Sequence, residues 1–274
     1  METIRKKDIV NKAGKIIVKI GSSTVTDEHG KIDEEFLENL SAQCRKLIDD
    51  GKKIIIVTSG ARMTGVGSIN KWSRKEDMNY KQALCAIGQV ALMGEYRRIF
   101  LEKDLHIAQI LLTKDDIKDD NRNLHIRNTL FTLIDENVIP VINENDTVCV
   151  EEIKIGDNDM LAARVGTLWA ADLVIMLSDI EGIYDKNPKE HKDAKLLEYI
   201  EDVENMEDIE FFEMEEGEKS NFGTGGITTK IEAAKLLSQY GCSLAITKGK
   251  PSPTAILDIF EDSVKYTLIR GEDE

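Results

Sequence analysis

A chain of 274 residues that is 41% hydrophobic and 32% charged can bury the core of a globular protein. Its net charge of −15 excludes nucleic acid and anionic membranes as main partners, because both require a basic face. There is no apolar run long enough for a signal peptide or a membrane span, and the four cysteines are scattered without a CxxC pair, so we expect a reduced, cytoplasmic protein without a disulfide scaffold or a zinc site.

The first two predicted strands end in turns of small residues. Residues 15–20 and 53–58 are short β-branched runs, separated by a helical stripe over residues 33–50. Gly21 follows the first strand and Ser59-Gly60 follows the second, and such turns let backbone N–H groups approach an anion closely. The repetition predicts a βαβ sheet whose backbone-lined loops lie along one edge.

Lys19 is a charged residue one position from the end of the first predicted strand. A lysine in an edge strand can extend its ammonium to solvent, which is the ordinary interpretation of such a residue. In a central strand whose loop can hold an anion, the same lysine would face the ligand. Taken alone, this residue leaves both interpretations open.

The middle of the chain predicts a flexible flap, a long helix, a strand and a second helix, at residues 61–80, 81–103, 107–112 and 123–136. A buried strand at residues 138–142 then stops at four polar residues, Asn143 to Asp146. A second polar cluster, residues 156–159, precedes a helix that begins at Met160. In a parallel sheet both clusters fall near the carboxyl end of a strand, where ligands bind.

An acidic turn with an ordinary helix cap is the alternative interpretation of these two clusters. Asp157, Asn158 or Asp159 could each cap the following helix by accepting a backbone N–H. Because two polar clusters converge on one strand end, we favour a binding site.

The last third of the chain predicts strands at residues 173–177, 243–247 and 265–270, the last of them at an edge of the sheet. A glycine-bearing loop, residues 221–226, leads into a helix that ends at Tyr240. The loop lacks the Gly-Lys-Ser/Thr ending of a P-loop and comes too late for a dinucleotide fingerprint. Its free N–H groups, the helix start and Lys230 remain suited to a polyphosphate.

These motifs together resemble the amino acid kinase family. The motifs that carry the resemblance keep the family order and span nearly the whole chain, at residues 18–23, 57–61, 140–146, 153–159, 178–184 and 223–230. The resemblance implies one domain over residues 1–274, a three-layer αβα open sandwich with a central, mainly parallel sheet. It also implies ATP as co-substrate, with Mg²⁺ carried by the nucleotide and no metal-binding residues in the protein.

The blocks at residues 143–146 and 156–159 are typical of family members that phosphorylate the side-chain carboxylate of L-glutamate, the first step of proline biosynthesis. The resemblance therefore implies proline as an inhibitor and glutamate-5-semialdehyde dehydrogenase as the next enzyme. It further implies a homo-oligomer and no role for nucleic acid or membranes. Many bacterial members carry an additional C-terminal PUA domain that resembles RNA-binding modules, and we expect this sequence to be the kinase domain alone.

The resemblance also assigns roles to residues. The catalytic group comprises Lys19, Lys230, Asp159, Gly21 and Gly60. The residues that would bind glutamate are Ser59, Asp146, Asn158, Asn145 and Asp157. Those that would bind ATP are Lys19, Ser178, Asp179, Thr224, Gly225, Gly226, Ile227, Thr228, Thr229 and Lys230.

The residue types themselves suit a carboxylate acceptor. A carboxylate is already ionised at neutral pH, so its phosphorylation needs no general base, and no histidine occurs in these motifs. Asp146 is a fitting partner for the ammonium of an amino acid. Two alternatives stay open: a kinase of the same fold acting on acetylglutamate, aspartate, carbamate or a nucleotide, and an amino-acid sensor without activity.

Overall fold

The structure is a computed structural model that describes residues 2–71, 77–148, 158–188, 190–204, 226–250 and 252–272. In this part of the chain eight strands form one sheet. Their bounds are β1 Lys15–Ile20, β2 Lys53–Thr58, β3 His106–Leu112, β4 Val138–Glu144, β5 Leu173–Ser178, β6 Tyr199–Ile200, β7 Ser243–Lys248 and β8 Tyr266–Ile269.

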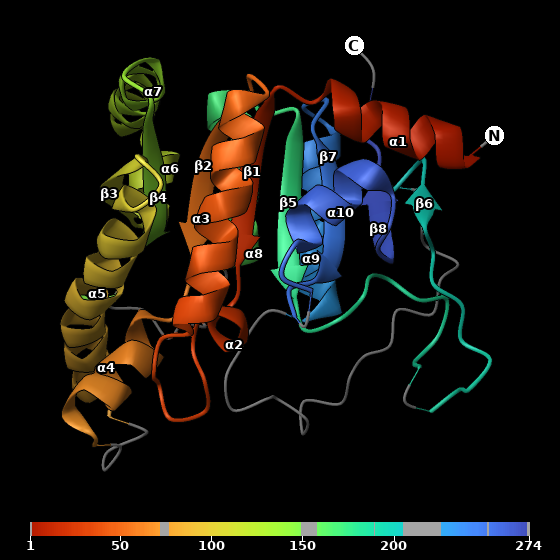
Figure 1. Ribbon diagram of the computed structural model, residues 1–274. Helices are drawn as coiled ribbons and strands as arrows, with labels where there is room; N and C mark the ends of the chain where they lie inside the picture. The colour runs from red at the N-terminus through yellow and green to blue at the C-terminus, as the bar shows by residue number, and fades with distance from the viewer. Residues whose placement is uncertain are drawn as a thin grey trace.

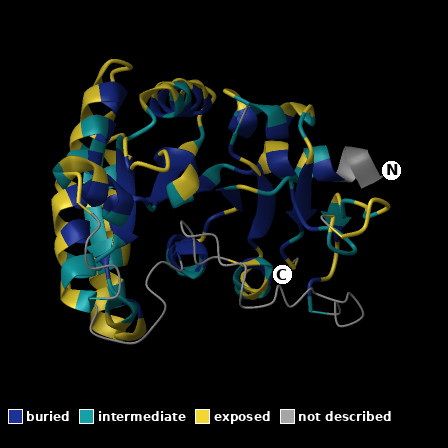
Figure 2. Ribbon diagram, turned by 90° about the horizontal axis from the view of Figure 1, so that it is seen from below, coloured by how far each residue is buried: buried dark blue, intermediate teal, exposed yellow. Residues whose placement is uncertain are grey.

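The sheet has the order β3-β4-β2-β1-β5-β7-β8-β6 and is parallel except where β7 pairs with β8. β1 is central, with β2 on one side and β5 on the other, and from Ile16 to Ile20 it is buried. Lys19 therefore lies in an interior strand, and the solvated edge lysine considered above is excluded. The strands that run parallel to β1 end at the lower edge in Figure 1, which Figure 2 views from below.

Helices cover both faces of the sheet. Their bounds are α1 Glu2–Lys12, α2 Ser22–Val25, α3 Glu34–Asp49, α4 Ala61–Ile69, α5 Met78–Leu101, α6 Lys114–Lys118, α7 Asp120–Asp135, α8 Asn158–Trp169, α9 Ile227–Ser238 and α10 Ala255–Glu261. Figure 1 shows α3 and α5 in front of the sheet, and they share one apolar core with α10. A second core lies between the sheet and α7, α8 and α9. The fold is the expected three-layer αβα sandwich.

The alternation of side chains along β1 separates the two cores. Ile16, Val18 and Ile20 pack into the core with α3 and α5. Ile17 packs into the other core, between α8 and α9, and Lys19 points the same way because successive strand residues face opposite sides. Figure 2 shows the result as a buried sheet between helices whose outer faces are exposed. The sequence of β1 therefore directs one ammonium towards the starts of α8 and α9.

Two expectations for individual elements are wrong. Residues 61–69 of the stretch predicted as a flexible flap fold into helix α4, which packs closely against α5, while residues 72–76 of that stretch lie outside the described residues. The last strand, β8, is not at an edge, because β6 lies beyond it and pairs with it in parallel. Within the described ranges, every helix lacks the length or the apolarity that a membrane crossing requires.

Candidate active site

Asp159 lies at the centre of a charged cluster at the carboxyl edge of the sheet. It is the second residue of α8, its side chain is fully buried, and it forms ion pairs with both predicted lysines. One carboxylate oxygen contacts Lys19 Nζ from β1, and the other lies 3.0 Å from Lys230 Nζ in the first turn of α9. Thr229 adds a hydroxyl that donates to the same oxygen at 3.2 Å. Residues from three distant parts of the chain therefore meet at one carboxylate.

The cluster contains more positive than negative charges. Burial pushes the pKa of Asp159 upwards, but Lys19 and Lys230 more than offset this and hold the pKa well below its ordinary range. Asp159 is therefore ionised at neutral pH. Two ammonium groups and one carboxylate leave one positive charge, and the lysines are only 9% and 3% exposed. A buried net positive charge favours binding of an anion.

Asn158 precedes Asp159 in α8 and forms a second, uncharged cluster with the ends of β2 and β4. Its side-chain nitrogen donates to Thr58 O at 2.8 Å, to Ser59 Oγ at 2.7 Å and to Asn143 Oδ1 at 3.1 Å. Asn143 Nδ2 in turn donates to Gln89 Oε1 of α5 at 2.8 Å. The first turn of α8 thus holds the charged cluster and the amide cluster side by side.

Asp146 lies just beyond β4 in a partly enclosed position. Burial, reinforced by the nearby Glu144 carboxylate, raises the pKa of Asp146 to about 6, although a hydrogen bond with Cys85 and the charge of Arg62 act in the opposite direction. Its Oδ1 atom is buried and has no hydrogen-bond partner among the described residues. A carboxylate oxygen of this kind is available for a cationic ligand.

The neighbouring residue, Asn145, is held within the turn that follows β4. Its backbone N–H donates to Leu112 O at 2.8 Å, and its side-chain oxygen accepts from Thr147 Oγ1 at 2.6 Å. The turn is therefore braced by its own hydrogen bonds next to Asp146.

Gly21 and Gly60 start the helices that follow β1 and β2. Gly60 has a φ of +101°, and a Cβ atom there would lie 2.6 Å from Val25 Cγ1, so only glycine fits. Gly60 is the N-cap residue of α4, and Gly21 is the N-cap residue of the short helix α2. Neither has a side chain that could cap the helix. The first N–H groups of α4 therefore lie beside Ser59 at the site, without a capping side chain.

The nucleotide residues predicted at β5 lie on the other side of β1 from this amide cluster. Ser178 ends β5, its hydroxyl donates to Asp179 at 3.0 Å, and its carbonyl accepts from Gly249 N–H at 2.9 Å. Gly226, Ile227 and Thr228 form the start of α9. Asp157, Thr224 and Gly225 lie outside the described residues.

The expectation that Asn158 or Asp159 caps α8 is wrong. Both residues are inside the helix, and their side chains bond to β1, β2, β4 and α9 instead. The helix already includes both residues at its first two positions, whereas a capping residue precedes the helix.

Several site residues were missed by sequence reasoning. Gln89 and Cys85 are interior positions of α5, and an amphipathic pattern does not mark such residues as polar contacts of a site. Lys248, the last residue of β7, is exposed and pairs in register with Ser178. A lysine at a strand end was the signal that identified Lys19, and the same signal could have identified Lys248.

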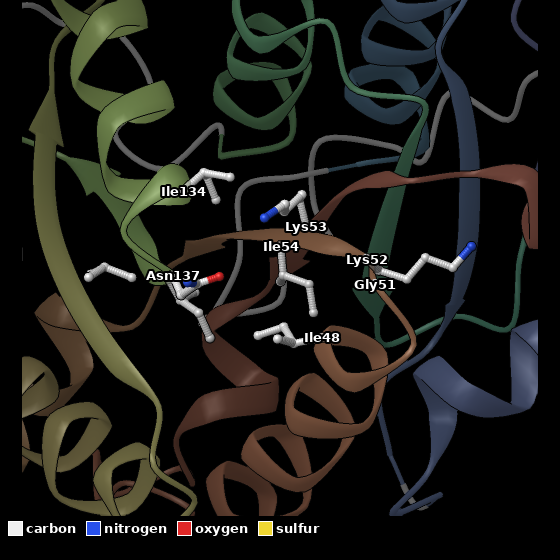
Figure 3. Close-up of a pocket in the computed structure, with 9 residues that line it drawn as sticks. Ile48, Gly51, Lys52, Lys53, Ile54, Ile134 and Asn137 are labelled. Atoms are coloured by element: carbon white, nitrogen blue, oxygen red, sulfur yellow. The ribbon is translucent and has the colours of Figure 1, made fainter.

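A small cavity elsewhere in the fold has no part in this site. It is lined mainly by aliphatic and lysine side chains near the amino ends of β2 and β4, such as Ile48, Lys53 and Ile134, together with Asn137 (Figure 3). These strand ends are at the edge of the sheet opposite to Asp159. None of the predicted site residues contributes to it.

The open parallel sheet, with two lysines converging on one carboxylate beside strand-end turns that can hold an anion, suits an enzyme that transfers a phosphoryl group. The chain belongs to the amino acid kinase family, whose sequence profile, described as "Amino acid kinase family", matches residues 14–248.

Curated relatives with substantial identity carry one name. A protein named glutamate 5-kinase from Alkaliphilus metalliredigens is 53% identical over 265 residues, which is 97% of this chain and 98% of the relative. A second glutamate 5-kinase, from Alkaliphilus oremlandii, is 52% identical over 266 residues, with coverage of 97% and 99%. The similarity therefore covers both the charged cluster around Asp159 and the amide cluster around Asn158.

Solved structures with the same fold are much less similar in sequence. UMP kinase from Ureaplasma parvum superposes with a TM-score of 0.63 at 18% identity, covering 94% of this chain and 99% of that chain. An isopentenyl phosphate kinase, solved as a substrate complex, gives a TM-score of 0.63 at 20% identity, with coverage of 94% and 100%. At these identities the similarity establishes the fold alone.

Proposed function

We propose that this protein transfers the γ-phosphoryl group of ATP to the side-chain carboxylate of L-glutamate, giving L-glutamyl 5-phosphate for proline biosynthesis. The observation that carries the proposal is the first turn of α8, where Asp159 holds Lys19 and Lys230 while the adjacent Asn158 reaches the ends of β2 and β4. Phosphoryl transfer and acceptor binding require such neighbouring subsites. The name shared by the 52–53% identical relatives supports the same activity.

The acceptor would lie beside Asn158 and Asp146. Asp146 presents an unpartnered carboxylate oxygen among the described residues, which suits the α-ammonium of glutamate. Ser59, at the amino end of α4, is positioned by Asn158 Nδ2 at 2.7 Å and lies where a second oxygen-rich group would bind. Asn145 and Asp157 complete the proposed set, Asn145 through the braced turn next to Asp146.

The transfer itself needs alignment and charge neutralisation but no base. An oxygen of the ionised glutamate carboxylate attacks the γ-phosphorus, the bond to the bridging oxygen breaks, and ADP leaves with the electron pair. Lys19 and Lys230 would neutralise the oxygens of the phosphoryl group in transit, with Asp159 fixing both ammonium groups. The N–H groups at Gly21 and Gly60 would add hydrogen bonds to the same oxygens.

ATP would bind on the β5 side, held by Ser178, Asp179 and residues 224–230, with its phosphates towards Lys19. Mg²⁺ would arrive with the nucleotide and neutralise its phosphates. Within the described ranges, no group of three or more His, Cys, Asp or Glu side chains could hold a metal ion. In this proposal the ion is bound through phosphate oxygens, and Lys19 and Lys230 add positive charge from the protein.

Three further proposals concern partners. Proline carries the same ammonium and α-carboxylate as glutamate, so we propose that it competes for the acceptor subsite. The acyl phosphate product is prone to hydrolysis, so a dehydrogenase such as glutamate-5-semialdehyde dehydrogenase would consume it directly. The third proposal is a homo-oligomer, in which the exposed Ile87 and Val90 of α5 would be candidates for contact between identical subunits.

Because ATP and glutamate are cytoplasmic metabolites, we propose that the protein acts in the cytoplasm. An ATP-dependent hydroxamate assay tests the proposed activity. Hydroxylamine traps an acyl phosphate, so colour should develop with glutamate and decrease when proline is added. The same assay with acetylglutamate, aspartate and carbamate tests whether the protein has the activity of another kinase with this fold. A nucleotide acceptor is tested by measuring ADP release. Turnover with one of these and none with glutamate would replace the proposal, and no turnover with any would favour a sensor.

A further inference from the structure

Three side-chain amides from three elements form one hydrogen-bonded chain at the acceptor end of the site. Gln89 of α5 accepts from Asn143 of β4 at 2.8 Å, and Asn143 accepts from Asn158 of α8 at 3.1 Å. All three residues are at least nine-tenths buried. We call this set the amide chain.

Backbone groups fix the direction of the amide chain. Thr58 O can only accept, so Asn158 must present its nitrogen to it, at 2.8 Å. Glu144 N–H can only donate, so Asn143 must present its oxygen to it, at 2.9 Å. The nitrogen of Asn143 then faces Gln89, which must present its own oxygen. Exchanging the oxygen and nitrogen atoms of any of these three side-chain amides would break at least one of the contacts. Donor and acceptor chemistry therefore determines the orientation of each amide.

The unpartnered atoms at the two ends agree with this direction. At one end, the Nε2 atom of Gln89 is buried without a partner among the described residues, which is the consequence of offering its oxygen to Asn143. At the other end, the Oδ1 atom of Asn158 is buried and unpartnered within the same ranges. Asp146 Oδ1, described above, is the other unpartnered acceptor of the acceptor subsite. Two acceptor oxygens without donors match a ligand that brings N–H groups.

We propose that Gln89 is a positioning residue that acts through Asn143 to hold the oxygen of Asn158 towards the α-ammonium of the acceptor. Gln89 thereby sets the preference for acceptors that carry an ammonium over those that do not. The inference rests on the proposed glutamate kinase activity and deepens it. Without an acceptor oxygen at position 89, the Asn143 nitrogen becomes a buried donor without a partner. Reversing Asn143 to relieve this would set nitrogen against both Glu144 N–H and Asn158 Nδ2.

The test compares glutamate with glutarate, which is the same dicarboxylate without the ammonium, in steady-state kinetics of the full chain. Gln89→Met should lower kcat/KM for glutamate about 10-fold or more, mainly through KM, as loss of a hydrogen bond to a charged group does. Activity with glutarate and the KM for ATP should stay within about twofold. Gln89→Glu keeps an acceptor oxygen and should restore most of the preference.

The matched control is Gln43→Met, because Gln43 is also a buried glutamine, whose amide donates to Pro253 O and accepts from Ile256 N–H in the other half of the fold. It should lower stability and leave the glutamate-to-glutarate ratio unchanged. If Gln89→Met does not fold, Gln89→Ala takes its place. Equal losses with both acceptors, or an unchanged ratio, would overturn the positioning role. A wild-type protein that does not phosphorylate glutamate would overturn the proposed function instead.

Discussion

Asp159 is the residue that makes it possible to bury two lysines at the end of a parallel sheet. An unpaired ammonium in this position would be strongly unfavourable, and removal of one partner from a buried pair typically costs about 3–5 kcal/mol. Because the pKa of Asp159 is lowered in the folded state, its contribution to the free energy of unfolding is present at neutral pH. That contribution is lost progressively as the pH falls from the ordinary carboxylate pKa through the lowered pKa of Asp159.

The first prediction concerns the transfer step. Lys19→Ala and Lys230→Ala should each lower kcat by about 10²–10³, because each removes a cation from the phosphoryl group in transit. KM values should change much less, and Asp159→Asn should resemble both variants. Steady-state kinetics of the double variant Lys19→Ala/Asp159→Asn should show a smaller loss than the two single losses combined. Additive losses would mean that Asp159 does not act through Lys19.

The second prediction is a pH dependence that arises from Asp146. Its pKa is raised to about 6, so below that pH the folded protein holds a proton where an ammonium should bind. We expect kcat/KM for glutamate to fall as the pH drops through about 6, while glutamate's own side chain stays ionised down to about pH 5. Asp146→Asn should bind glutamate roughly 10–150-fold less tightly and lose this limb of the profile. A limb that persists in the variant would belong to another group, such as the nucleotide phosphates.

The site residues that could be found from sequence alone are those whose charge or polarity differs from that of their neighbours in the chain. Lys19 is a charge inside an aliphatic strand, and Lys230 follows a glycine loop, so each stands out among its neighbours in the chain. Gln89 and Cys85 do not, because a polar residue within a long helix is ordinary. Their partners, Asn143 and Asp146, become neighbours only when α5 packs beside β4, and no local pattern encodes that contact.

At the level of elements, the site depends on the close crossing of α4 and α5. A Cβ atom at Gly88 of α5 would lie 1.7 Å from Ala61 O and 2.3 Å from Gly65 N, so the two backbones nearly touch. Because Ala61 begins α4 directly after Gly60, this crossing sets the position of the helix start beside Ser59. The stretch was predicted as a flap because its glycines suggest flexibility, whereas they allow close packing.

The third prediction compares two glycines of α5. Gly88→Ala should destabilise the protein by about 3 kcal/mol or more, because its neighbours are backbone atoms that cannot rotate away. It should also raise the KM for glutamate, since α4 must shift. Gly94→Ala is the matched control, with no atom within 4 Å of the added Cβ, and should stabilise by up to about 1 kcal/mol. Denaturant unfolding measures both, and equal behaviour would show that the crossing is not tight.

The predicted elements agree with the structure where a hydrophobic period is long enough to detect. Strands β1 and β2 match the predicted ranges, and α5 and α7 differ by a few residues at their ends. The two-residue strand β6 lies in a run dominated by acidic residues and has no period of its own. The position of β8 inside the sheet depends on its pairing with β6, which sequence periodicity cannot provide.

For the whole molecule, the site joins elements from residue 19 to residue 230, so neither half of the chain can form it. This supports the proposal that residues 1–274 are one domain, because the cluster around Asp159 is buried between β1, α8 and α9. The net charge of −15 makes the local positive charge of this cluster the main attraction for anionic substrates.

The fourth prediction follows from this arrangement. Glutamate at about 100 times its Kd should stabilise the folded state by about 2.7 kcal/mol, which raises Tm by roughly 5 °C or more. Calorimetry should show one transition that moves as a whole, and the shift should be much smaller for Asp146→Asn. Two transitions of which only one responds to glutamate would indicate two domains.

The central place of β1 has a consequence for synthesis on the ribosome. β1 is the first strand to emerge, yet one of its neighbours, β5, begins about 150 residues after β1 ends. At roughly 5–20 residues per second, the aliphatic segment from Ile16 to Ile20 waits about 8 to 30 s for that partner. During this interval the nascent chain displays an unpaired, apolar strand edge, the kind of surface that general chaperones cover and that aggregation exploits.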